Sequence, residues 1–344
     1  MATEARHETP PRTSDGPSEE LADLDPDLLR SMFRTMLVAR AVDERMWQMN
    51  RAGQAPFAVS GQGHEAAQAG MAAAMDTSKD WLVPYYRDVA LSIAFGLTPR
   101  DILLAQLSRA DDPTSGGRQM PNHFSARDRR IFSGSSVIAT QMPHATGIAF
   151  AAKARGEDTV TVVCFGEGAT SEGDFHEAMN FASIYDLPVI FFCQNNEYAI
   201  SVPTRLQMGV ERVADRARGY DMPGVRVNGM DAVEVYLAAR EAVDRARNGG
   251  GPTLLEAMVR RFHPHSSDDD DRTYRPEEEL AVLRENGPIR VTAERLKSLG
   301  VIDDEWVEST QSEIRQQVND ATAEAEDAPL PSPDSYARHV YFER

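Results

Sequence analysis

Apolar residues recur at intervals of three and four over long stretches of the chain, which is the spacing of one face of an α-helix. The first such stretch runs from Leu28 to Met49 and stops near Gly53. A second, over residues 66–74, follows a glycine-containing turn at 61–63 and consists mostly of alanine and glycine. The pattern predicts two helices, the second with small side chains against which another backbone can pack closely.

The middle of the chain has the pattern of a buried parallel sheet. Residues 159–165 (TVTVVCF) and 187–193 (LPVIFFC) are short continuous apolar runs, typical of strands covered on both faces. Residues 174–185 between them have helical spacing, so the segment predicts two parallel strands with a right-handed crossover. A helix over 232–247 and an apolar run at 253–259 repeat the pattern. We expect an α/β fold whose parallel sheet is covered by helices on both faces.

The two ends of the chain differ from this middle part. Residues 1–24 mix Pro, Ser, Glu and Arg without an apolar stretch, which predicts a disordered leader rather than a signal or transit peptide. After Arg275 the sequence becomes polar and helical. We therefore predict a leader over 1–24, an α/β domain over 25–275 and a helical tail over 276–344, with helical extensions at both ends.

Composition narrows the classes of protein to which the chain can belong. It has 54 acidic against 36 basic side chains and a formal charge of −18, which repels nucleic acid and acidic membrane surfaces. No run of 18 apolar residues exists to span a membrane. The two cysteines, Cys164 and Cys193, are too few for a disulfide framework or a cysteine zinc site, which favours a reducing cytoplasm.

Candidate chemistry follows directly after the two central strands. Gly166-Glu167-Gly168 ends the first run and Gln194-Asn195-Asn196 the second. Ligands of open parallel sheets bind beyond the carboxyl ends of the strands, and carboxylate and amide oxygens suit Mg²⁺ or Ca²⁺. A divalent ion there, beside a helix N-terminus, makes a diphosphate site. Gly-Glu-Gly alone is more often a turn with an exposed acid, so the inference depends on the pairing of the two motifs.

Gly166-Glu167-Gly168, followed after 26 residues by Asn195-Asn196, resembles the thiamine-diphosphate motif. From about residue 28 to 340 the chain resembles the α subunit of the decarboxylating component of branched-chain 2-oxo acid dehydrogenase complexes. Five further blocks carry the resemblance in the same order: 85–88 (YYRD), 117–121 (GRQMP), 135–141 (SSVIATQ), 227–231 (VNGMD) and 265–269 (HSSDD). The resemblance implies a thiamine-diphosphate-binding fold.

The resemblance also assigns roles to individual residues. It implies that Mg²⁺ is held by Glu167, Asn196 and the carbonyl of Tyr198. Contacts to thiamine diphosphate fall to Tyr86, Arg87, Ser136, Ile138, Gly168, Ala169, Arg261 and His265, of which Ser136 and His265 are also assigned to catalysis. A potassium site that orders the loop falls to Ser135, Val137, Thr140 and Gln141. Ser266 matches a position phosphorylated in mitochondrial relatives, where a phosphate would add about two negative charges.

Several residues leave alternatives open. Arg87 can bind a phosphate through its planar fork or pair with Asp88. His64 either takes part in catalysis or orders its turn, and we favour the structural role. Gln194 stands where relatives often have a diphosphate-binding arginine, which predicts weaker cofactor binding or compensation by Mg²⁺. The aspartates at 268–271 are either a solvated acidic loop or, with His263 and His265, the metal site of a hydrolase.

The resemblance further implies an incomplete enzyme. In two-chain members the glutamate that activates the cofactor lies on the β subunit, so we expect an α2β2 tetramer. It would decarboxylate a 2-oxo acid and pass the acyl group to the lipoyl domain of an acyltransferase, with His265 handling protons. The motifs after Glu167 and His265 favour a branched-chain substrate. The alternatives are a pyruvate or acetoin dehydrogenase α subunit and, from another class, a non-catalytic regulatory or scaffold subunit.

Overall fold

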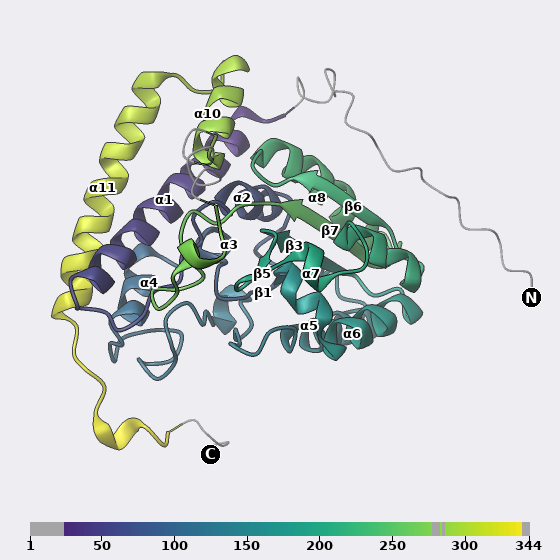
Figure 1. Cartoon of the computed structure of the whole chain (residues 1–344), viewed down its shortest axis with the longest axis horizontal. Coiled ribbons are helices and arrows are strands. Elements are labelled where there is room, and N and C mark those ends of the chain that lie inside the picture. Colours follow the sequence, from purple (N-terminus) through teal and green to yellow (C-terminus); the bar gives the residue numbers. More distant parts are fainter. Residues whose placement is uncertain (1–23, 277–282, 284–285, 339–344) are drawn as a thin grey trace, which may run out of the picture.

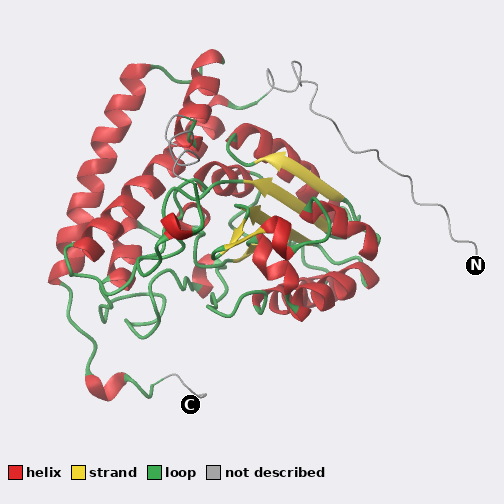
Figure 2. Ribbon diagram, viewed as in Figure 1, coloured by secondary structure: helices red, strands yellow, loops and turns green. Residues whose placement is uncertain are grey.

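The computed structural model describes residues 24–276, 283 and 286–338. The predicted leader therefore lies outside the described residues, except for Leu24, as do parts of the predicted tail. The described chain is an α/β structure in which one sheet is surrounded by helices (Figures 1 and 2).

Five parallel strands form the sheet, in the order β1-β2-β3-β7-β6. Their bounds are Trp81–Val83 (β1), Thr161–Phe165 (β2), Val189–Asn195 (β3), Thr253–Met258 (β7) and Gly224–Asn228 (β6). The predicted parallel pairing of the two central runs is confirmed, with helix α6 (Gly173–Ile184) between them. The pairs Phe165 with Cys193 and Asn195 with Met258 bring the carboxyl ends of β2, β3 and β7 to one edge.

Side chains on the two faces of the sheet enter two separate clusters of buried residues. On one face, Val162 and Phe192 pack with α1 (Pro26–Arg51), α2 (Glu65–Ala73) and α8 (Ala232–Arg247). On the other, Val163 and Phe191 pack with α5 (Gln141–Arg155) and α6. Cys164 and Cys193 are both buried in these strands as thiols. Helices on both faces explain why the central strands are continuously apolar.

The remaining helices surround this centre. They are α3 (Val89–Ala94), α4 (Pro99–Gln106), α7 (Thr204–Gln207), α10 (Pro288–Ser298) and α11 (Asp304–Asp327), with 3₁₀ turns η1 (Arg127–Arg129), η2 (Glu167–Ser171), η3 (Val213–Tyr220), η4 (Asp271–Thr273) and η5 (Pro333–Ser335). A two-stranded hairpin joins β4 (Tyr198–Ala199) to β5 (Val202–Pro203). Helix α11 lies along α1, and its Ile314 and Val318 enter the same buried cluster as Phe33 (Figure 1). Among the described helices, none combines the length and the apolar character needed to cross a membrane.

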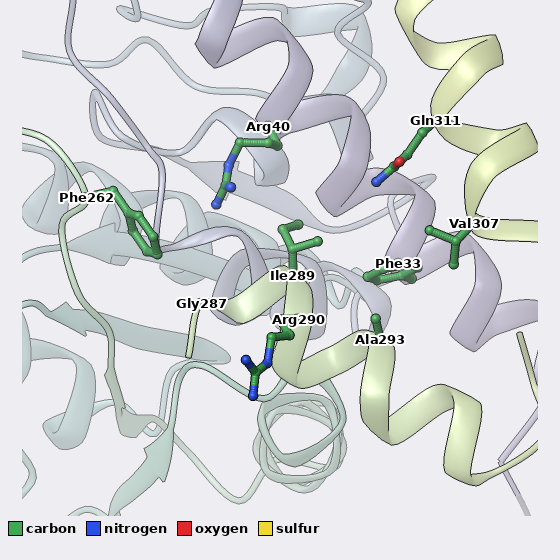
Figure 3. A pocket seen from close by; sticks show the side chains of 9 residues that line it. All are labelled: Phe33, Arg40, Phe262, Gly287, Ile289, Arg290, Ala293, Val307 and Gln311. Atoms are coloured by element: carbon green, nitrogen blue, oxygen red, sulfur yellow. The ribbon is translucent and has the colours of Figure 1, made fainter. Parts of the chain in front are cut away.

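A cavity of about 290 Å³ opens between α1, α10 and α11 (Figure 3). It is lined by Phe33, Arg40, Phe262, Gly287, Ile289, Arg290, Ala293, Val307 and Gln311. The guanidinium of Arg40 already pairs with the buried carboxylate of Glu65, at 2.7 Å between Nη2 and Oε1. None of these lining residues belongs to the site predicted from sequence.

Close packing of α2 on α8 depends on Gly70. A Cβ at this position would lie 2.5 Å from the carbonyl oxygen of Ala232 and 2.9 Å from the Cβ of Val235. Gly147, within α5, has no atom within 4 Å of the equivalent position. Alanine substitution at the two glycines therefore distinguishes the effect of helix packing on stability from the effect of helix propensity.

We expect Gly70→Ala to lower the free energy of unfolding by about 1–3 kcal/mol, because α2 and α8 must move apart. Gly147→Ala should instead raise it by up to about 1 kcal/mol, because alanine loses less backbone entropy in a helix. Urea unfolding of both variants measures the two effects. Shifts of the same sign would contradict the packing described for Gly70.

Candidate functional site

The three residues predicted to hold a metal lie together where β2 and β3 end. Glu167 is 1% exposed, and its Oε2 accepts a hydrogen bond from the backbone N–H of Asn196 at 3.1 Å. The Oδ1 of Asn196 accepts from the backbone N–H of Tyr198 at 3.2 Å. Burial raises the pKa of Glu167 to about 7, because the backbone hydrogen bond and the charges of Arg261 and Arg87 offset the cost of burying the carboxylate only in part.

The glycine after Glu167 allows two segments to approach each other. A Cβ at Gly168 would lie 3.0 Å from the Cβ of Ala199 in the β4–β5 hairpin. Gln207 on α7 donates its Nε2 hydrogen bond to the carbonyl of Glu167 at 2.8 Å. The turn η2, which carries Glu167, Gly168 and Ala169, is thus clamped between the hairpin and α7.

Two buried arginines face this turn from different loops. Arg87, 2% exposed, follows β1 and donates from Nη1 to the carbonyl of Ser60 at 2.7 Å and from Nη2 to the carbonyl of His265 at 2.9 Å. The alternative pairing of Arg87 with Asp88 is not found, because Asp88 accepts instead from the backbone of Tyr85 and from Gln194. Burial, together with the charge of Arg261, lowers the pKa of Arg87.

Arg261 has hydrogen-bond donors to spare. It is 3% exposed, its Nη2 donates to the carbonyl of Ile200 and to the hydroxyl of Tyr274, and its guanidinium lies over the ring of Tyr198. Its Nε and Nη1 are buried and have no hydrogen-bond partner among the described residues. A buried guanidinium with unused donors is costly unless an anion completes it. The site is therefore suited to a phosphate-sized anion.

The geometry around His265 fixes its tautomer. Its Nδ1 lies 3.0 Å from Nη2 of Arg87, and because an arginine nitrogen only donates, Nδ1 accepts. Burial and the charges of Arg87 and Arg261 lower the pKa of His265 to about 4. At neutral pH the ring is therefore uncharged and carries its proton on Nε2. Tyr86 packs edge-on against this ring, with centroids 5.9 Å apart.

The loop that carries Arg261 and His265 is held at several points. The backbone N–H of His265 donates to Asp269 at 2.7 Å, and the ring of His263 stacks on Trp47 with centroids 4.5 Å apart. These contacts show no metal cluster of His263, His265 and aspartates, and across the described ranges no three His, Cys, Asp or Glu side chains are grouped to hold a metal. Ser266 is 8% exposed, so this residue is largely covered. Its phosphorylation stays a prediction.

The segment 135–141 has hydrogen bonds of its own, one of which reaches the end of β2. The Oγ of Ser136 lies 2.5 Å from Nε2 of His123, Val137 is 68% exposed and Ile138 is 38% exposed. Gln141 is buried and donates to the carbonyl of Cys164, while its Oε1 has no partner in the described part of the chain. Ser135 accepts from the backbone of Val137, and Thr140 directly precedes α5. The hydrogen bonds and ring contacts among described residues do not link Ser135–Ile138 to Glu167, Arg87 or Arg261.

Sequence reasoning missed a buried polar network behind the arginines. His64 Nδ1 lies 3.0 Å from Oε1 of Gln194, which also accepts from Gln68 at 2.9 Å. Gln194 in turn donates from Nε2 to Asp88 at 2.6 Å, and burial raises the pKa of Asp88 to about 7. One signal was present: Gln68 is a lone amide among the small residues of the second predicted helix.

Helix α1 holds the turn that contacts Arg87, which the sequence did not reveal either. Asp43, 1% exposed, accepts from the Oγ of Ser60 at 2.7 Å and from the backbone N–H of Gly61 at 2.6 Å. One turn earlier, Arg40 pairs with Glu65, which accepts from the backbone N–H of Gly63. The carbonyl that Ser60 presents to Arg87 is thus positioned from α1.

Comparison with known proteins agrees with the motifs. Residues 33–334 match the family described as dehydrogenase E1 component. The chain is 51% identical over 310 residues to the 2-oxoisovalerate dehydrogenase subunit alpha of Bacillus subtilis, covering 90% of this chain and 94% of that protein. It is 36% identical over 319 residues to the 3-methyl-2-oxobutanoate dehydrogenase subunit alpha of Mycobacterium tuberculosis, covering 93% and 83%. The human mitochondrial 2-oxoisovalerate dehydrogenase subunit alpha is 35% identical over 328 residues, covering 95% and 73%.

The raised pKa of Glu167 gives a prediction about stability. Because the folded protein holds this proton more tightly than the unfolded chain does, the contribution of Glu167 to stability falls as the pH rises from about 5 to 7 and is lost above. In EDTA at pH 8, Glu167→Gln should therefore be more stable than the wild type by about 1–3 kcal/mol, because it buries no charge.

At pH 5 the two proteins should unfold at nearly the same urea concentration, since Glu167 is then protonated. Asp43 and Asp88, whose pKa values burial also raises, are present in both proteins and cancel in the comparison. A wild type that is the more stable protein at pH 8 would contradict an uncompensated carboxylate.

Proposed function

The chain belongs to the dehydrogenase E1 component family, and on that premise we propose that it is the α subunit of the decarboxylating component of a branched-chain 2-oxo acid dehydrogenase complex. The proposed reaction is the oxidative decarboxylation of branched-chain 2-oxo acids with thiamine diphosphate, followed by acyl transfer to the lipoyl group of an acyltransferase. The names of the Bacillus subtilis and Mycobacterium tuberculosis relatives support the branched-chain substrate.

The observation that carries the proposal is the incomplete hydrogen bonding of Arg261. Two of its buried N–H groups lack partners among the described residues, and they lie in the same charge environment as Arg87 and the carboxyl of Glu167. A diphosphate would accept from these donors, and Mg²⁺ would balance the ionised Glu167. The residues present therefore fit the diphosphate end of the cofactor together with its metal.

The chemistry that thiamine diphosphate supplies when bound is an electron sink for the loss of CO₂ from a 2-oxo acid. Arg87 and Arg261 would bind its diphosphate, with backbone contacts from Gly168 and Ala169 and the ring of Tyr86 alongside. Glu167, Asn196 and the carbonyl of Tyr198 would hold Mg²⁺. Because Nδ1 of His265 accepts from Arg87, its Nε2 carries the proton at neutral pH. This Nε2–H would act as the donor during acyl transfer to the lipoyl group.

The segment 135–141 has a separate proposed role. Ser136 and Ile138 would contact the thiamine rings, Ser136 also taking part in catalysis. Ser135, Val137, Thr140 and Gln141 would bind K⁺, which would order the exposed segment. The unpartnered Oε1 of buried Gln141 supports a cation ligand at that position.

A β subunit completes the proposed enzyme as an α2β2 tetramer, and a lipoyl domain of the acyltransferase is its second partner. Exposed apolar side chains on this chain support the proposal that a β subunit covers the segments that follow the strands. Val137 is 68% exposed, and in the segment after Tyr198, Ile200 is 56% and Leu206 70% exposed. Apolar groups this exposed are typical of surfaces that another chain covers.

Co-expression with candidate β subunits tests the function. We expect decarboxylation that requires thiamine diphosphate and runs faster with 3-methyl-2-oxobutanoate than with pyruvate. A preference for pyruvate would contradict the substrate class, and turnover without thiamine diphosphate would contradict the reaction itself.

The role of Arg261 gives a prediction about binding. Arg261→Met should weaken binding of magnesium thiamine diphosphate to the αβ complex by about 10- to 100-fold, because charged hydrogen bonds are lost. Arg261→Lys should have an affinity between those of the wild type and Arg261→Met, since lysine keeps the charge but not the planar fork. Arg290→Gln is the control, because Arg290 is exposed and pairs with Glu294 on α10. Calorimetric titration measures all four proteins, and equal affinities would refute the assignment.

A further inference from the structure

His64 is a fully buried histidine with one ring nitrogen unused. It directly precedes α2, its side chain has 0% exposure, and its Nδ1 lies 3.0 Å from Oε1 of Gln194. Its Nε2 is buried without a hydrogen-bond partner among the described residues. A buried polar atom left without a hydrogen bond destabilises the fold.

The neighbours of His64 determine what this nitrogen is. Gln194 donates from Nε2 to Asp88, so the atom that faces His64 is its carbonyl oxygen, which also accepts from Gln68. An amide oxygen only accepts, so Nδ1 of His64 carries a proton. Burial and the charge of Arg87 lower the pKa of His64 to about 3, which makes the ring neutral. The unused Nε2 is therefore a bare acceptor.

His64 lies against the loop that carries Arg261. A Cβ at Gly63 would lie 1.8 Å from the carbonyl oxygen of Arg260, and the backbone N–H of Phe262 donates to the carbonyl of Gln62. The charges of Arg87 and Arg261 both act on the imidazole. The charged and titratable groups around it are Tyr85, Arg87 and Asp88 after β1, Glu65 on α2, Asp43 on α1, Glu167 after β2 and Arg261 after β7.

We propose that His64 is a further ligand of the cofactor's diphosphate, which it binds through Nε2 after taking up one proton from solvent as the anion enters. This inference rests on the proposed function. Burial and the charges of Arg87 and Arg261 keep the ring unprotonated; a diphosphate between the two arginines neutralises their charges, and its own negative charge offsets the cost of a buried imidazolium. The new Nε2–H then donates to a phosphate oxygen while Nδ1–H stays on Gln194. His64 thereby supplies a charge that the amide of Gln194 lacks.

Two variants isolate the unused nitrogen. His64→Asn keeps an N–H at the position that faces Gln194 and removes Nε2. His64→Gln keeps a polar side chain of similar reach that cannot take up a proton. His176→Gln, on the outer face of α6, is the control for a histidine change away from the site.

The experiment is calorimetric titration of the αβ complex with magnesium thiamine diphosphate between pH 7 and 8, in buffers that differ in ionisation enthalpy. The wild type and the His176 control should take up about one proton more than either His64 variant, and their affinity should rise up to about tenfold per pH unit as the pH falls. Both His64 variants should bind about tenfold more weakly at pH 7 and lose this extra pH dependence.

The outcomes separate this inference from the proposed function. A wild-type complex that fails to bind thiamine diphosphate overturns the proposed function. A wild type whose affinity has the same pH dependence as that of the His64 variants overturns the role of His64 alone, because the proton that Glu167 would release as Mg²⁺ binds is common to all the proteins. Equal proton uptake in the wild type and in either His64 variant overturns it as well.

Discussion

The structure depends on the burial of two guanidinium groups at the carboxyl edge of a parallel sheet. Arg87 and Arg261 are almost fully covered, and each contacts backbone carbonyl oxygens rather than a carboxylate. Carbonyl dipoles orient the two groups but leave their charge uncompensated, and this positive region exists inside a chain of formal charge −18. Glu167 is buried beside them, and its carboxylate is a negative charge whose burial is also only partly compensated. The protein therefore carries unbalanced charges of both signs that an anion and a cation together would resolve.

The sheet explains how such a site can be kept. Parallel strands buried on both faces make a rigid centre, and their carboxyl ends bring η2, the β4–β5 hairpin and the loop after β7 to one edge. Buried polar groups that do not touch the site support it from behind. Glu256, in the middle of β7, accepts from the side chain of Asn195 and from the backbone of Ala214, which fixes the end of β3.

The sequence was informative where a local pattern decides the structure. We could predict the strands β2, β3 and β7 and the helices α1, α6 and α8. A segment buried on one or two faces must have apolar residues at fixed spacings, and these spacings are visible in the sequence. Strand β1 has three residues, and β6 is largely exposed, so neither has a recognisable apolar pattern. The pairing of His64 with Gln194, 130 positions apart, and the hold of Asp43 on residues 60–62 depend on how helices meet the sheet. Motif resemblance could name Arg261 but not its unused donors.

Helix α1 has a mechanical consequence. Arg40, Asp43 and Trp47 project from successive turns of one 26-residue helix, and each holds a different part of the site: Glu65, the turn at 60–62, and His263. A helix of this length is a stiff rod of about 39 Å, so the three attachments share its displacement. The turn before α2, whose Ser60 carbonyl contacts Arg87, and the loop after β7, which carries Arg261, are therefore both attached to the same helix. A substitution that shifts α1 at its contact with α11 would therefore act on both segments at once.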